Sequence, residues 1–172
     1  MSAVTLSSVN FSGTYASTVT LTTDLLVSSS VISAVSATGH LDLNGHRIAI
    51  GSDLTADGLT FFSSVAGSTV EFNGSSYGVA SKSPGPLRFE NVEFNKTNST
   101  LTVTSDLIVT STFSVFGGTV IVQGARIDLT GDFFLNGYLD VRTSTLALVG
   151  STPQQLGGDV NAVVTSFAGL YI

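Results

Sequence analysis

Apolar and polar residues alternate in short runs along the whole chain. The period of two is clear at Val19–Leu21, Val70–Phe72, Leu101–Val103 and Leu146–Leu148. Gly, Asn, Asp and Ser separate these runs, which is typical of half-buried β-strands joined by turns. No segment has the 3.6-residue period of an amphipathic helix. The pattern therefore predicts an all-β protein with essentially no helix.

Segments from the first half of the chain recur in the same order in the second half. The matched pairs of ranges are 19–27 with 101–109, 41–48 with 120–127, and 68–75 with 144–151. Such self-similarity indicates a duplicated unit, here of about 80 residues. We therefore predict one repeat over 1–88, a second over 89–166, and the start of a third over 167–172.

Two architectures fit short strands in duplicated units. A parallel β-solenoid with about 20 residues per coil stacks like residues on like, which explains why Val, Thr, Ser and Asn are abundant and charges are rare. The alternative is a tandem antiparallel β-sandwich or jelly roll, because Asn44-Gly45 between two apolar runs is a strong hairpin signal. The sandwich leaves the extra segment after the second repeat unpaired. We therefore favour one continuous solenoid and keep the sandwich as the alternative.

Composition excludes several classes of protein. The chain has 172 residues, no Cys, 10% charged residues and a formal net charge of −6. The lack of Cys excludes disulfides and Cys-ligated metals. Its 6 Lys and Arg residues are scattered along an acidic chain, which does not favour nucleic acid. No apolar run reaches the roughly 18 residues of a membrane-spanning helix, so we expect no membrane insertion.

Residues 41–48, with the sequence LDLNGHRI, resemble a segment common in right-handed parallel β-helices of the pectate-lyase-like group. The segments SDLIVTSTF at 105–113, TVEFNGS at 69–75 and STPQQLGG at 151–158 resemble repeats of β-helical (β-solenoid) surface and autotransporter-type adhesins of bacteria. The resemblance covers most of the chain. It implies a β-helix with a surface or fibre role, and it implies no catalysis.

Acidic residues recur at matched positions of the two repeats. Asp24 matches Asp106, and Asp53 matches Asp132. Recurrence favours turn formation by the Asp side chains over a single active site. Solenoid turns can gather carboxylates around calcium, but the Gly- and Asp-rich calcium repeat is absent. We expect no catalytic residue, no cofactor and no metal, with calcium as the one ion to consider.

One group of ionisable residues occurs in a single copy. Asp42 and His46 alternate onto one side of an extended segment, and the second repeat has Ile121 and Ala125 at these positions. Tyr77 lies in a Ser-rich and Pro-rich loop, where its ring can face a sugar. We therefore name Asp42, His46 and Tyr77 as candidate glycan contacts.

Both ends of the sequence are apolar and strand-like. Solenoids usually have polar or irregular caps, because an end strand otherwise presents unpaired backbone groups. We predict that the ends are assembly surfaces, formed by Val4, Leu6, Val9 and Phe11 on one side and by Phe167, Leu170, Tyr171 and Ile172 on the other. Contact between two unlike ends builds a head-to-tail homo-oligomer or filament.

These inferences favour a non-enzymatic structural protein, a β-solenoid subunit or module of an extracellular fibre, surface layer or adhesin. Its partner would be a second copy of itself, together with a glycan or a host surface, and its place would be outside the cell or on the cell surface. Two alternatives stay open. One is a virion structural protein (capsid, tail fibre or decoration protein), and the other is a carbohydrate-binding or carbohydrate-cleaving β-helix.

Overall fold

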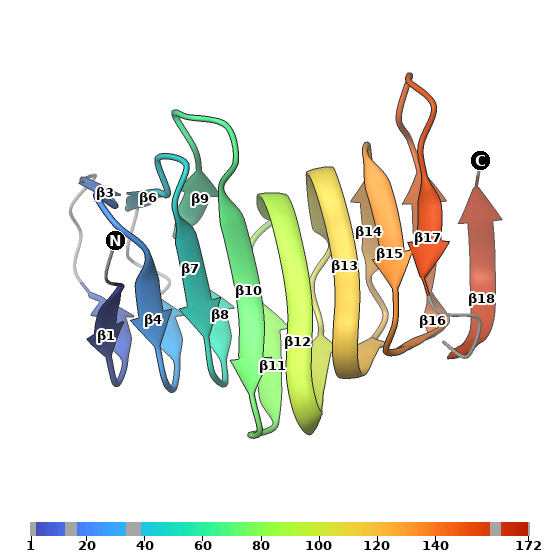
Figure 1. Ribbon diagram of the computed structural model, residues 1–172, viewed down its shortest axis with the longest axis horizontal. Coiled ribbons are helices and arrows are strands. Elements are labelled where there is room, and N and C mark those ends of the chain that lie inside the picture. The colour runs from blue at the N-terminus through green and yellow to red at the C-terminus, as the bar shows by residue number, and fades with distance from the viewer. Residues whose placement is uncertain (1–2, 13–16, 34–38, 159–162, 172) are drawn as a thin grey trace.

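The computed structural model describes residues 3–12, 17–33, 39–158 and 163–171, with side chains given through residue 158 except at Phe62 and Arg142. Within these residues every regular element is a β-strand, and every strand pairing is parallel. The strands stack in successive coils as a β-solenoid of about 7 turns (Figure 1). The predicted all-β parallel solenoid is confirmed, and the antiparallel sandwich is wrong.

Each coil contributes strands to three faces. The first face contains β1 (Val4–Leu6), β4 (Leu25–Val27), β7 (Arg47–Ile50), β10 (Thr69–Gly74), the middle of β12 (Leu87–Val103), the middle of β13 (Leu107–Val122), β15 (Asp132–Leu135) and β17 (Leu156–Gly158). The second face contains β2 (Val9–Phe11), β5 (Val31–Ser33), β8 (Leu54–Ala56), β11 (Gly78–Ser81), the ends of β12 and β13, and the starts of β16 (Tyr138–Leu148) and β18 (Val163–Tyr171).

The third face is divided between two sheets. The first sheet contains β3 (Thr18–Thr20), β6 (His40–Asp42) and β9 (Thr60–Phe62). The second contains the starts of β12 and β13, then β14 (Arg126–Leu129) and the ends of β16 and β18. No ladder joins β9 to β12 among the described residues.

Alternation along many of the strands places apolar side chains in the interior. In β8, for example, Leu54 and Ala56 are buried, whereas Thr55 between them is half-buried. Aromatic rings follow one another along the axis: Phe72 lies 5.4 Å from Phe94, Phe94 lies 5.2 Å from Phe113, and Phe113 lies 5.5 Å from Phe133, measured between ring centroids. These separations are in the range where rings attract each other.

The coil length is close to the predicted value of about 20 residues. Hydrogen bonds between neighbouring coils join residues such as Ser28 and Leu6, 22 positions apart, or Ser30 and Asp53, 23 positions apart. Asn44 and Gly45 adopt left-handed φ angles of 49° and 77°. They form a turn, as the sequence indicated, but the turn is a corner that leads from β6 on the third face to β7 on the first.

The unit that repeats in the structure is the coil. Segments that match in sequence at a separation of about 80 residues lie on different faces. Val19 is on the third face and its match Leu101 is on the second, while Val70 is on the first face and Leu146 is on the third. The repeat boundaries at 88 and 166 therefore remain a prediction about the sequence.

Candidate functional site

Asp42, a candidate glycan contact, is buried at the end of β6. Its carboxylate accepts hydrogen bonds from the backbone N–H of Asn44 and of Ser64, both at 2.9 Å, and from the Ser64 hydroxyl at 2.7 Å. Burial alone would raise the pKa of Asp42, but the hydrogen bonds from Ser64 and Asn44 outweigh it and hold the pKa below 3.8. Both oxygens of the carboxylate therefore hold the corner together.

His46 and Tyr77, the other two candidates, lie apart. His46 Nδ1 is 3.5 Å from the Asp24 carboxylate of the preceding coil, at the corner between the third and first faces. Tyr77 lies between β10 and β11, at the corner between the first and second faces, and is 59% exposed. Its hydroxyl is 3.0 Å from the Thr102 hydroxyl. The structure thus places the three residues at two different corners.

The most strongly bonded ionic group lies on the outside of the first face. Glu71 and Glu93 are register partners in β10 and β12, where two carboxylates would repel each other. The Arg47 guanidinium lies between them, 2.5 Å from Glu71 and 3.2 Å from Glu93. The amides of Asn73 and Asn95 also donate to Glu71. These carboxylates are held by structural partners, which leaves Glu71 without a free oxygen for acid–base chemistry.

Burial and polar contacts also act on the side chains of two cations, Arg47 and Lys96. Burial alone would lower the pKa of Arg47, but its hydrogen bond and charge interaction with Glu71, with smaller help from Glu93, raise it. Lys96, near the end of the first-face segment of β12, is almost completely buried. Its ammonium donates to the carbonyl of Ser76 at 3.2 Å and to that of Gly51 at 2.6 Å, 45 positions away.

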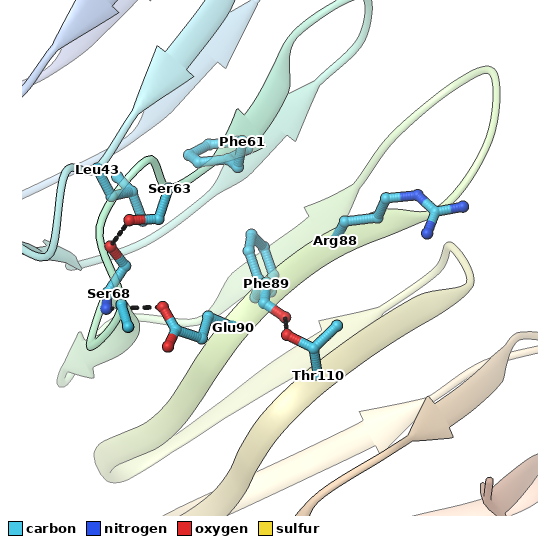
Figure 2. Close-up of a pocket in the computed structure, with 9 residues that line it drawn as sticks. Leu43, Phe61, Ser63, Ser68, Arg88, Phe89, Glu90 and Thr110 are labelled. Atoms are coloured by element: carbon cyan, nitrogen blue, oxygen red, sulfur yellow. Dashed lines mark hydrogen bonds between the residues drawn. The ribbon is translucent and has the colours of Figure 1, made fainter. Parts of the chain in front are cut away.

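A recess opens where the third face is interrupted between β9 and β12. It has a volume of about 470 Å³ and adjoins a smaller cavity of about 140 Å³, with which it shares Phe61 and Arg88. Figure 2 shows its walls: the recess is lined by apolar Leu43, Phe61, Ala66 and Phe89 and by polar Ser63, Ser68, Arg88, Glu90 and Thr110. The rings of Phe61 and Phe89 meet edge to face across the interruption, 5.6 Å apart.

The interruption has a local cause in the sequence. The coil that leads from β9 to β12 includes the loop after β11, with Ser83, Pro84 and Pro86, which lengthens it. Lys82 at the start of this loop donates to the Ala56 carbonyl at 3.1 Å and to the Leu59 carbonyl at 2.5 Å. The Pro and Gly residues mark this loop in the sequence, but no pattern singles out Arg88 beside it.

The predicted assembly ends are described only in part. Val4 and Leu6 lie in β1, the first strand of its sheet, and are 47% and 41% exposed. Val9 and Phe11 in β2 are half-buried and pack against the core. Phe167, Leu170 and Tyr171 lie in β18, which pairs with β16, and Ile172 is outside the described residues. Leu156 in β17, which the sequence did not single out, is 62% exposed.

In the part of the chain that the structure describes, no three His, Asp or Glu side chains gather as a metal site. No helix in the same part is long and apolar enough to span a membrane.

Comparison of the chain with protein-family models, with curated proteins and with solved structures gives no match.

Proposed function

We propose that the chain is a non-enzymatic structural protein, a β-solenoid module that extends end to end in an extracellular fibre, surface layer or adhesin. The observation that carries this proposal is the edge of β1. This strand pairs with β4 on one side, and it has no partner on the other side among the described residues. An edge of this kind presents a row of backbone N–H and C=O groups to a further parallel strand.

The exposed side chains support the same proposal. Val4 and Leu6 on β1 are 47% and 41% exposed, and Leu156 on β17, the last described strand of the first face, is 62% exposed. Full burial of such a side chain contributes about 1.5–3 kcal/mol. When β17 of one copy packs against β1 of the next, the apolar side chains of both strands leave water. The two edges are unlike, so the contact is heterologous and continues into a filament.

The polar groups favour a structural role over catalysis. The Glu71 carboxylate is held by Arg47 and two Asn amides, and Asp42 is held by the turn around Ser64. With 10% charged residues, the chain limits the like-charge repulsion between stacked coils, and Arg47 offsets it at the register partners Glu71 and Glu93. These are properties of a scaffold that repeats the same contacts along its length.

The proposal is tested by electron microscopy and light scattering on the purified chain over a concentration series. We expect filaments or open oligomers that grow with concentration. Leu6→Lys should abolish growth, because it places a charge on the open edge. Ile32→Lys is the matched control: Ile32 is 44% exposed, but its strand β5 has neighbours on both sides.

Two outcomes would contradict the proposal. The first is a monomer at every concentration tested, with circular dichroism showing β-structure. The second is a loss of assembly that is equal for Leu6→Lys and Ile32→Lys, since the open edge would then have no special role.

A further inference from the structure

The recess between β9 and β12 lies where the otherwise regular solenoid is irregular. The loop of residues 63–68 follows β9 on one side, and the lengthened loop after β11 comes before β12 on the other. Insertions in repeat proteins map to loops on one face, which is often the face that binds a partner. A volume of about 470 Å³ lies within the range of sites for small molecules.

Most polar groups around the recess already have partners. The Ser68 hydroxyl lies at hydrogen-bond distance from the Ser63 hydroxyl and accepts from the Gly45 N–H. Both Glu90 oxygens accept backbone N–H groups, one from Gly67 and one from Ser68, at 2.9 Å each. A ligand inside the recess therefore meets apolar walls. Its own hydroxyl groups would lose water without gaining partners, which is costly.

Arg88 is the exception at the mouth. Arg47, Lys82, Lys96 and Arg126 each have a hydrogen-bond or ion-pair partner. Arg88 is exposed and has neither among the residues that the structure describes. Figure 2 shows its side chain extending away from Glu90. This guanidinium has no ion-pair partner among the described residues, and it lines a largely apolar recess whose one carboxylate, that of Glu90, is held by backbone N–H groups.

We infer that the recess binds a small molecule with a flat apolar body and a single carboxylate. The body packs against Phe61 and Phe89, and the carboxylate pairs with Arg88. A guanidinium binds a carboxylate through two parallel hydrogen bonds, and these charge-assisted bonds are stronger than neutral ones. A neutral sugar is a poor occupant, because it has many hydroxyls and the recess offers few free partners.

The test uses 2-naphthoate as the probe and 2-naphthylmethanol as its uncharged analogue, with binding measured by isothermal titration or ligand-observed NMR. A ligand of this size typically reaches a Kd of about 1 mM or tighter. We expect naphthoate to bind at least about tenfold more tightly than the alcohol, and Arg88→Gln to remove this preference.

Two further variants separate the recess from general surface effects. Ala66→Trp places a large ring at the mouth on an exposed loop residue, so it should block both probes while the fold is kept. Arg126→Gln, which removes an exposed Arg that does not line the recess, should change neither Kd. Equal binding of acid and alcohol, unchanged binding in Arg88→Gln, or no binding of naphthoate at about 10 mM would each overturn the inference. Binding of acidic peptides alone would overturn the small-molecule assignment.

Discussion

Replacing Lys96 with Met tests the most unusual buried group of the solenoid. Its ammonium is almost inaccessible to water and donates to two backbone carbonyls, those of Gly51 and Ser76. Met has a similar length and fills the same space without a donor. The carbonyls belong to the backbone, so no substitution can remove them, and Lys96→Met leaves both without this partner.

The expected cost follows from these two contacts. A buried acceptor that loses its partner costs about 1–3 kcal/mol. Removal of the buried charge recovers part of this, because burial of an ammonium is itself unfavourable. We therefore expect Lys96→Met to lower the free energy of unfolding by about 2 kcal/mol at pH 7. Lys82→Met is the comparison: Lys82 is half-buried, water can replace its ammonium, and the cost should stay below about 1 kcal/mol.

The same side chain predicts a dependence on pH. Burial lowers the pKa of Lys96 from 10.5, and the charge of Asp53 opposes only part of this effect. Between the lowered pKa and 10.5 the unfolded chain binds more protons than the folded chain, so stability rises with pH in that window. Lys82 contributes in the same direction, because burial lowers its pKa as well.

Urea unfolding followed by circular dichroism measures both effects, at pH 7 and at steps up to about 10.5. We expect the rise of stability with pH to be smaller in Lys96→Met than in the wild type. If Lys96→Met were as stable as the wild type at pH 7, with an unchanged urea slope, the two carbonyls would not depend on the ammonium and the reasoning would be refuted.

Two other substitutions test local features of the coil. The pKa of Asp42 lies below 3.8, so its contribution to stability is present above pH 3.8 and is lost as the pH falls through the lowered pKa. Asp42→Asn should therefore lower Tm at pH 7 and weaken the dependence of Tm on pH below 3.8. Identical curves of Tm against pH for the variant and the wild type would contradict this. Gly51→Ala places a Cβ against the backbone carbonyl of Ser28 and should strongly lower Tm. Gly117→Ala is the control and should be tolerated, because the atom nearest to its new Cβ would be 3.6 Å away. Equal effects of the two substitutions on Tm would refute the close-packing argument.

The alternation of residues is enough to predict the strands and the absence of helix, whereas the parallel stack is favoured over the sandwich by the composition and by the extra segment after the second repeat. Inward positions such as Val70 and Phe72 are marked by their spacing, and low charge agrees with stacking of like on like. Asn44-Gly45 is recognisable as a turn from its residue types. The local pattern does not determine the angle through which the chain turns there. The same dipeptide is therefore compatible with a hairpin between antiparallel strands and with a corner between two faces of a solenoid.

Other features depend on contacts between coils, which no local pattern contains. Lys96 stands in the polar run Asn95 to Asn98 and reads as a solvent-facing residue, yet it is buried because two turns from earlier coils direct carbonyls at it. The recess depends on the lengths of two loops in consecutive coils. The run Ser83-Pro84-Gly85-Pro86 is recognisable as a loop from its residue types, and Arg88 stands two residues after it.

The reach of individual side chains has a consequence for how the solenoid unfolds. Coils that contact only their neighbours can fray one at a time, and the interruption after β9 would be a natural place for the stack to separate. The link from Lys96 to Gly51 and the link from Arg47 to Glu93 both cross this boundary and skip the coil between. They couple coils that do not touch through the backbone. We therefore expect amide hydrogen exchange on both sides of the interruption to report one shared opening free energy, so that the solenoid behaves there as a single cooperative unit.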